Sequence, residues 1–207
     1  MIFGLKKFSN GTSIFFMRIV AGKYRGRTLA VLDTSATRPT SDRARESIFN
    51  ILDSRLRKCG AAWTDLSVLD AFAGTGALGV EAASRGVPEV CFMEKDAGAL
   101  KALRQNIAPL EKDGCQIAVF PDVLAPPQAG KTPDLVFMDP PYRKGLVGVA
   151  LAALSERGWI GEKTVCVIET ERNETPDLPA GLIIRETREY GKAKVIFASF
   201  GDPFFAA

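Results

Sequence analysis

From residue 66 to the end, short apolar runs alternate with longer amphipathic stretches, and this alternation limits the possible folds more than any other feature. Apolar runs of about four to eight residues that are rich in β-branched and aromatic side chains predict strands. Longer stretches with apolar residues three and four positions apart predict helices. Strands that alternate with helices predict an α/β fold, in which a parallel sheet carries helices on both faces.

The expected strands of this region are 66–71, 89–93, 116–120, 134–138 and 165–168, and the expected helices are 77–85, 96–107 and 146–157. The end of the chain differs, because the strands predicted at 182–189 and 193–200 are joined by the short turn 190–192. Two strands with so short a connection predict an antiparallel hairpin. The sheet should therefore be mostly parallel, with an antiparallel pair at the C-terminal end.

The first sixty residues have another organisation. Short strands at 18–20 and 28–32 predict a β-hairpin, and Thr40 or Ser41 can cap a helix that runs to about Arg57. One face of this helix is apolar, and we expect Arg43, Arg45 and Glu46 to lie away from its centre; its members are Ala44, Ile48, Ile51, Leu52 and Leu56. We divide the chain into a dispensable leader (1–16), a hairpin and helix (17–60) and an α/β domain (61–207).

Composition excludes several classes of protein. The chain has no histidine and no C-x-x-C pair among its four cysteines, so we expect no metal site. No apolar run approaches the roughly 20 residues that span a bilayer, and we expect a cytoplasmic protein without membrane contact.

Basic residues concentrate near the N-terminus. Residues 17–45 contain seven Lys and Arg against two Asp, whereas the whole chain has a net charge of only +3. A basic segment on a mildly acidic body predicts an anionic partner on one side of the molecule.

In open α/β sheets ligands bind outside the carboxyl ends of the strands. The first strand is followed by a glycine-rich turn in which Gly74, Gly76 and Gly79 match G-x-G-x-x-G. That pattern alone also suits a dinucleotide. Asp70 argues against a dinucleotide, because its carboxylate would repel a pyrophosphate but attract the ammonium and sulfonium groups of S-adenosylmethionine. With Phe72 the segment reads D-x-F-x-G-x-G and resembles motif I of class I methyltransferases.

Two further acidic residues follow the next two strands. Glu94 can accept hydrogen bonds from the hydroxyls of a ribose, which does not by itself distinguish between cofactors. Asp122 can accept a bond from an adenine amino group, although an Asp after Pro121 is equally typical of a simple turn. The predicted cofactor is therefore S-adenosylmethionine, held by Asp70, Phe72, Gly74, Gly76, Glu94 and Asp122.

The strand at 134–138 ends in Asp139-Pro140-Pro141-Tyr142, which is the most specific signal in the chain. It resembles the [DNS]-P-P-[YFW] motif of amino-methyltransferases. An aromatic exocyclic amine is a poor nucleophile, and the Asp139 carboxylate and the Pro140 carbonyl can each accept one of its N–H groups. The prolines fix the direction of that carbonyl because their φ is locked, and Tyr142 can stack on an extruded base.

The N-terminal segment narrows the choice of substrate. It reads R-I-V-A-G-K-Y-R-G-R from Arg18, R-P-T-S-D-R-A-R-E from Arg38, and F-N at Phe49 and Asn50. Together with the glycine-rich turn and the D-P-P-Y block, these segments are similar in order and spacing to the RsmD family of bacterial 16S rRNA guanine-N2 methyltransferases. The resemblance covers about residues 17–200, whereas residues 1–16 match nothing in the family pattern.

The resemblance implies a seven-stranded, Rossmann-like class I methyltransferase that modifies a guanine N2 amine in 16S rRNA of an assembled or assembling small ribosomal subunit. It also implies that a basic set of residues lies near the site, and we expect the protein to act as a monomer. The expected RNA-contacting residues are Lys23, Arg25, Arg27, Arg38, Thr40, Arg43 and Arg45. The alternatives are an N6-adenine methyltransferase of DNA or RNA and a non-catalytic RNA-binding assembly factor.

Overall fold

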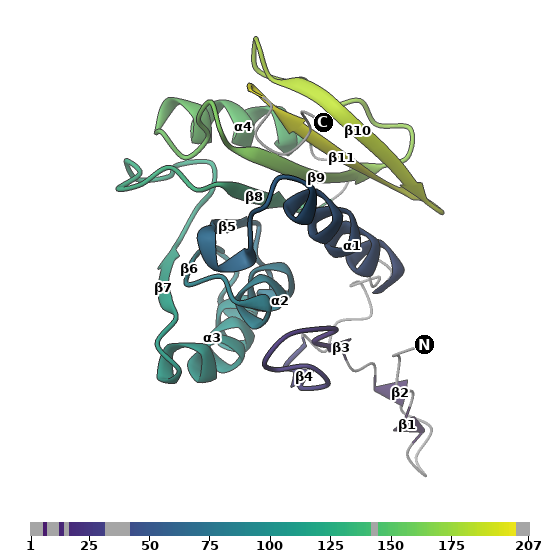
Figure 1. Ribbon diagram of the computed structural model, residues 1–207, viewed down its shortest axis with the longest axis vertical. Coiled ribbons are helices and arrows are strands. Elements are labelled where there is room, and N and C mark those ends of the chain that lie inside the picture. The colour runs from purple at the N-terminus through teal and green to yellow at the C-terminus, as the bar shows by residue number, and fades with distance from the viewer. Residues whose placement is uncertain (1–5, 8–12, 15–16, 32–41, 142–144, 202–207) are drawn as a thin grey trace.

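A seven-stranded sheet forms the centre of the molecule in the computed structural model, which describes residues 6–7, 13–14, 17–31, 42–141 and 145–201 (Figure 1). Its strand order is β10-β11-β9-β8-β5-β6-β7. The strands are β5 (Ser67–Ala71), β6 (Glu89–Met93), β7 (Gln116–Phe120), β8 (Leu135–Met138), β9 (Val165–Glu171), β10 (Ile183–Tyr190) and β11 (Ala193–Ser199). Strands β5 to β9 are parallel and β11 runs antiparallel to both β9 and β10, which confirms the expected fold class.

Helices cover both faces of this sheet. They are α1 (Asp42–Lys58), α2 (Ala77–Arg85), α3 (Ala97–Lys112) and α4 (Leu146–Glu156), with a short 3-10 helix η1 (Trp63–Asp65) before β5. Successive side chains of β5 point to opposite faces, so that Val68 joins the core beneath α1, α2 and α3 while Leu69 joins the core beneath α4. Among the described residues no helix has the length and hydropathy needed to cross a membrane.

Two elements are longer than the sequence pattern predicts. Helix α3 continues past Ile107 and through Pro109 to Lys112, because Leu110 adds another buried side chain to its apolar face. Strand β9 continues past Ile168 to Glu171, because β11 pairs with it along its whole length. The last residues of β9 are polar, so the pattern of apolar residues does not predict this part of the strand. Two of them, Glu169 and Thr170, are nevertheless buried.

Helix α1 packs its apolar face onto the sheet and belongs to the same core as β5 and β8. The Phe49 ring lies 5.5 Å from the Phe137 ring and 5.6 Å from the Trp63 ring, measured between centroids. The hydrophobic core is therefore continuous across the boundary that we place near residue 60.

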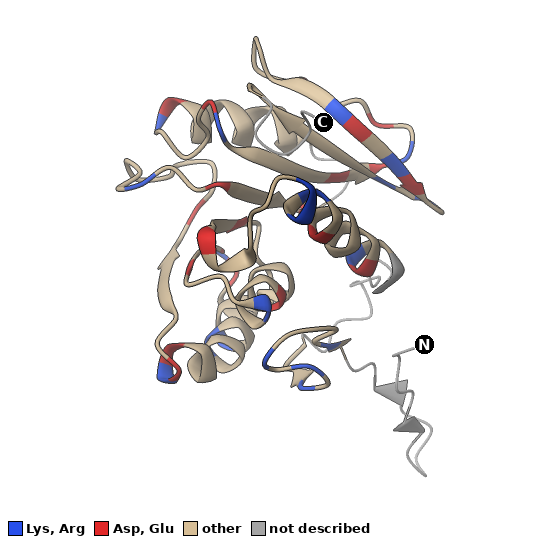
Figure 2. Ribbon diagram, viewed as in Figure 1, with Lys and Arg blue, Asp and Glu red and all other residues tan. Residues whose placement is uncertain are grey.

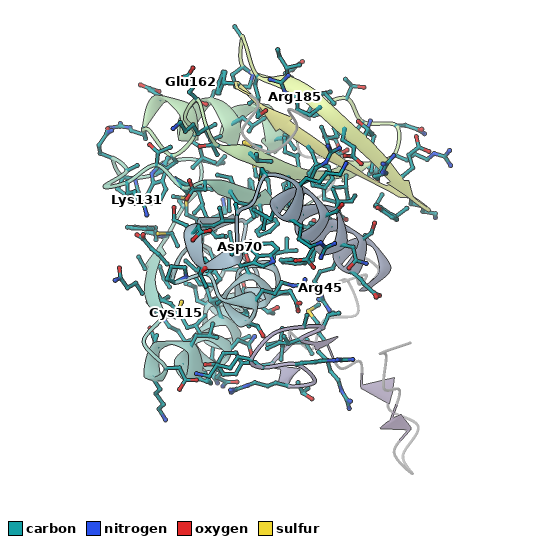
Figure 3. All side chains as sticks on the ribbon, in the orientation of Figure 1. Arg45, Asp70, Cys115, Lys131, Glu162 and Arg185 are labelled. Carbon is teal, nitrogen blue, oxygen red and sulfur yellow. The ribbon has the colours of Figure 1, made fainter. Side chains whose placement is uncertain are left out.

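Arg45 differs from expectation. We predicted that it would lie away from the centre of the apolar face of α1, but it is only 5% exposed and lies between α1 and the N-terminal hairpin (Figure 3). It stands three and four residues before Ile48 and Phe49, which places it on their side of the helix. Its Nη2 donates to the Arg18 carbonyl at 3.1 Å.

The predicted N-terminal hairpin is present, with β3 (Met17–Arg18) paired antiparallel to β4 (Thr28–Leu29). A second pair of two-residue strands, β1 (Lys6–Lys7) and β2 (Ser13–Ile14), lies within the leader. Whether the leader is dispensable stays a prediction.

The hairpin docks on α2 through a buried carboxylate. Glu81 is 1% exposed, and its Oε2 and Oε1 accept the N–H groups of Val20 at 2.7 Å and Ala21 at 3.0 Å. The Ser84 hydroxyl donates to the Ala21 carbonyl at 2.6 Å. At Gly22 a Cβ would lie 1.8 Å from the Ser84 carbonyl oxygen, so only glycine permits this close approach of hairpin and helix.

The same carboxylate is joined to helix α1. Arg85 Nε donates to Glu81 Oε1 at 3.0 Å, and Arg85 Nη1 lies 2.5 Å from the Asp53 carboxylate. Trp63 Nε1–H donates to that carboxylate at 2.6 Å, and the Arg85 guanidinium lies 4.7 Å from the centre of the Phe49 ring. One buried ion-pair network therefore holds the hairpin, α1, α2 and η1 together.

Replacing Glu81 with Ala should destabilise the protein by about 3–5 kcal/mol, because it leaves two backbone N–H groups without an acceptor and removes one of the two carboxylates that pair with Arg85, Asp53 being the other. Urea unfolding of this variant measures the loss. Glu111→Ala, an exposed change on α3, is the matched control and should cost less than about 0.5 kcal/mol. A loss below about 1 kcal/mol for Glu81→Ala would show that the network contributes little.

Candidate active site

The candidate site lies where the direction of chain progression across the sheet reverses. Strands β5 and β8 are neighbours, with Ala71 opposite Met138, but the chain proceeds from β5 to β6 on one side and from β8 to β9 on the other. The two connections that leave β5 and β8 therefore diverge, which is where open α/β sheets bind ligands. The segments that begin at Phe72 and Asp139 therefore start from paired strand ends at the same edge of the sheet.

Strand β6 brings a third segment to the same edge. Met93 lies opposite Ala71, and the Ala73 N–H donates to the Met93 carbonyl at 2.9 Å. Glu94 follows directly, and its N–H donates to the Phe120 carbonyl at the end of β7 at 3.0 Å. The sheet thus brings together the predicted cofactor-binding and amine-binding segments, as the strand-end argument anticipated.

The turn after β5 has an unusual backbone. Phe72 adopts φ +63°, in the left-handed region that non-glycine residues seldom occupy, and Gly74 follows at φ +56°. A Cβ at Gly74 would meet nothing within 4 Å, so the backbone conformation, and not a close neighbour, explains the glycine at this position. The same observation shows open space beside the turn. Gly79 has a different reason, since a Cβ there would lie 2.4 Å from the Phe92 ring; it allows α2 to pack closely on β6.

Asp70 lies in the interior of the molecule and is 2% exposed (Figure 3). Its Oδ2 accepts the Gly79 N–H at 2.8 Å, which ties the end of β5 to the first turn of α2. Burial raises the pKa of this carboxyl from 3.8 to about 7; the bond from Gly79 opposes the shift, and the nearby charge of Glu94 adds to it. The contact shown is thus with the protein backbone, and a role toward a cofactor stays a proposal.

Glu94 is half-buried and braces the glycine-rich turn. Its Oε2 accepts the Gly74 N–H at 2.7 Å, and its Oε1 accepts the N–H groups of Lys95 at 2.8 Å and Asp96 at 2.6 Å. A carboxylate offers about four acceptor positions. These three bonds leave room for about one more donor, so a ribose that donated from both hydroxyls would have to displace one of them.

Asp122 forms the turn that its sequence context suggested. Its Oδ1 accepts the Leu124 N–H at 2.9 Å, which is the geometry of an Asx turn. The turn interpretation therefore has a contact to support it, whereas contact with an adenine stays a proposal.

The amine-binding block is described only in part. Asp139 is half-buried at the end of β8, Pro140 is buried and Pro141 is exposed. Tyr142 lies outside the described residues, as do Arg38 and Thr40, and the side chain of Arg43 is likewise not described.

The N-terminal hairpin carries three of the predicted RNA-contacting residues on its surface. Lys23, Arg25 and Arg27 all lie on its surface (Figure 2). Lys23 pairs at 2.8 Å with Asp113, the residue that follows α3, and this contact raises the pKa of Lys23 and lowers that of Asp113. Within the parts of the chain that the structure describes, Arg25 and Arg27 form no ion pair. Their charge is therefore the more available to an external anion, whereas Arg45 is buried.

Two buried polar residues that contact the N-terminal hairpin were not predicted from the sequence. Glu81 and Asn106 are both buried, and both hold the N-terminal hairpin. A signal existed for Asn106, because this polar residue falls on the apolar face that α3 forms with Leu103, Ile107 and Leu110.

Comparison with known proteins identifies the family. A family model described as Conserved hypothetical protein 95 matches residues 17–199. A protein of Escherichia coli strain K12 named Ribosomal RNA small subunit methyltransferase D is 33% identical over 177 residues, covering 85% of this chain and 86% of that protein. The chain belongs to the RsmD family. A protein of the same name from Haemophilus influenzae is 34% identical over 174 residues, covering 82% and 86% of the two chains.

Solved structures agree with this membership. A putative methyltransferase from Escherichia coli is 33% identical and matches with a TM-score of 0.73, covering 88% of this RsmD-family chain and 97% of the other. A hypothetical protein from Thermus thermophilus is 30% identical with a TM-score of 0.69, covering 88% and 99%. An rRNA methyltransferase from Streptomyces viridochromogenes is only 14% identical, covers 84% and 90%, and with a TM-score of 0.61 supports the class I methyltransferase fold alone.

The raised pKa of Asp70 predicts a pH-dependent stability. Its folded value of about 7 lies above the ordinary 3.8, so its contribution is fully present below about pH 4 and is lost as the pH rises through 7. Asp70→Asn keeps an acceptor for Gly79 but cannot ionise. Between about pH 5 and pH 8 the variant should gain about 2–3 kcal/mol relative to wild type in urea unfolding.

The control for this comparison is Asp177→Asn at an exposed position, which should follow the wild-type profile. Parallel profiles for Asp70→Asn and wild type would mean that Asp70 stays ionised in the folded protein.

Proposed function

We propose that this chain transfers a methyl group from S-adenosylmethionine to the exocyclic N2 amine of a guanine in small-subunit ribosomal RNA. The observation that carries the proposal is the position of Asp139 and Pro140, at the end of β8 and directly beside the turn that follows β5. Membership of the RsmD family and the names of its relatives support rRNA as the substrate. The same membership supports an assembled or assembling small subunit as the partner.

The residues at the edge of β5 and β6 fit the proposed cofactor. The left-handed backbone at Phe72 and Gly74 and the open space at Gly74 allow a ligand to approach the main chain. Glu94 retains acceptor capacity for a ribose hydroxyl, and Asp70 places a carboxyl group near the same turn. Two carboxyl groups suit a ligand with an ammonium group and no phosphate. When bound, S-adenosylmethionine supplies an electrophilic methyl group on its sulfonium sulfur.

The residues after β8 would act on the amine. The nitrogen lone pair of a guanine N2 amine is delocalised into the ring, and acceptors for its two N–H groups orient the nitrogen toward the methyl group. Asp139 supplies one acceptor and the Pro140 carbonyl the other, with the carbonyl direction fixed because Pro140 and Pro141 have restricted φ. Such positioning is a large part of what a catalyst can contribute when the electrophile is already activated. Tyr142 would hold the base by stacking.

Asp139→Ala should reduce methyl transfer about 100-fold or more while S-adenosylhomocysteine affinity stays within about twofold of wild type, because it removes an acceptor that is assigned to the amine and not to the cofactor. Transfer of labelled methyl groups to small-subunit RNA measures the first quantity and calorimetry the second. Asp177→Ala serves as the control at an exposed aspartate. Transfer within a few-fold of wild type in Asp139→Ala would refute the assignment.

The same assay separates the proposal from its alternatives. Digestion of the labelled RNA to nucleosides should place the label on N2-methylguanosine. Label on N6-methyladenosine would instead identify an adenine methyltransferase. Binding of RNA without any transfer by the wild-type chain would indicate an assembly factor.

The double variant Arg25→Ala/Arg27→Ala should weaken RNA binding and flatten its salt dependence by about 0.7–0.9 per lost phosphate contact. Adding Lys23→Ala should change little more, because Asp113 already neutralises that lysine. The measurement is affinity for small-subunit RNA at several salt concentrations. Lys163→Ala/Lys192→Ala, which removes two exposed charges elsewhere, is the control. Identical salt plots for the hairpin variant and wild type would show that the hairpin does not contact RNA.

A further inference from the structure

Asn106 connects the N-terminal hairpin to the glycine-rich turn. It lies in the middle of α3 and is 5% exposed. Its Oδ1 accepts the Ala30 N–H at 2.8 Å, and its Nδ2 donates to the Ala30 carbonyl at 3.1 Å and to the Thr75 carbonyl at 2.8 Å. Ala30 follows β4 in the hairpin, and Thr75 lies between Gly74 and Gly76 in the turn after β5.

The chemistry of this site requires an amide. One N–H and two carbonyl groups face the side chain, and a primary amide offers one acceptor group and two donor hydrogens. A carboxylate in its place would accept from Ala30 but would face the Ala30 and Thr75 carbonyl oxygens with negative charge. Asn106 is buried and its three bonds are partly buried, so their loss would leave backbone groups without partners.

Both of the elements that Asn106 joins are held firmly elsewhere. Glu81 and Ser84 fix the hairpin to α2. Just beyond the end of α3, the Asp113 carboxylate accepts the O–H of Tyr24 in the hairpin. The turn is closed by the bond from the Gly76 N–H to the Ala73 carbonyl at 2.7 Å. A shift of the hairpin relative to α3 would therefore act through Asn106 on the Thr75 carbonyl and on the turn around it.

We propose that Asn106 is a positioning residue that couples the basic hairpin to the cofactor-binding turn. This inference rests on the proposed function. It means that an anionic partner bound to the hairpin changes the affinity of the turn for S-adenosylmethionine, and that S-adenosylmethionine changes the affinity of the hairpin for the anionic partner. Such coupling is reciprocal, since each ligand must change the affinity for the other by the same factor.

The first test is Asn106→Asp, with calorimetric titration of S-adenosylhomocysteine in the absence of RNA. We expect affinity to fall about 5-fold or more, in the range typical of coupled sites. Gln105→Glu makes the same change of amide to carboxylate at the neighbouring exposed position and should leave affinity unchanged. If Asn106→Asp lowers only the unfolding midpoint while affinity stays at the wild-type value, Asn106 is merely structural and the proposal is wrong.

The second test disturbs the hairpin at a distance from the turn. Gly22→Ala introduces a Cβ that would lie 1.8 Å from the Ser84 carbonyl oxygen and must displace the hairpin from α2. In an otherwise wild-type chain it should weaken S-adenosylhomocysteine binding and accelerate amide hydrogen exchange in residues 73–80. In the Asn106→Asp background it should add little to either quantity, because the connection is already broken. Additive effects of the two changes would overturn the proposal.

Hydrogen exchange separates this proposal from the proposed function, because it needs no ligand. If the wild-type chain bound no S-adenosylhomocysteine but Gly22→Ala still accelerated exchange in 73–80 through Asn106, the cofactor assignment would fail and the coupling would stand. If Gly22→Ala left both exchange and affinity unchanged while the wild-type chain bound S-adenosylhomocysteine, the coupling would fail and the cofactor assignment would stand.

Discussion

The parallel pairing of β5 with β8 is the constraint on which the rest of the structure depends. Every residue of both strands is buried, and the chain departs from them in opposite directions across the sheet. This pairing places the glycine-rich turn and the Asp139-Pro140 segment at the same edge, although they are separated by about 65 residues of sequence. Because both strands are fixed by packing on two faces, the segments that follow them start from rigid positions.

In this chain without histidine, several carboxylates connect secondary-structure elements. Asp70 joins β5 to α2, Glu94 joins the glycine-rich turn to the start of α3, and Glu81 joins the hairpin to α2. Each accepts backbone N–H groups, and Glu81 also has the guanidinium of Arg85 as a partner. A buried charge is costly unless it is paired or hydrogen-bonded, and these contacts supply that compensation. Asp70 has the fewest of them, which agrees with its raised pKa.

Much of the fold followed from periodicity, and the parts that did not have identifiable physical reasons. The helix α2 and the strands β6 and β7 begin and end where the pattern of apolar residues predicts. The sequence predictions that were wrong concern polar residues. Thr170 in β9 is buried because β9 pairs with a distant strand, and Arg45 is buried by a hairpin that precedes it in the chain. Such contacts join segments far apart in sequence, which local patterns do not record. The order of strand ends predicted which segments meet at the site. It did not predict that Asn106 would join the N-terminal hairpin to the glycine-rich turn.

The proposed methylation of a guanine N2 amine in small-subunit rRNA is best tested in cells. Small-subunit rRNA from cells with and without the gene for this chain can be digested and its nucleosides quantified by mass spectrometry. Loss of the gene should remove N2-methylguanosine from one position of that RNA, and the wild-type gene should restore it. An unchanged amount of N2-methylguanosine, or loss of a different methylated nucleoside, would show that this chain does not methylate a guanine N2 amine there.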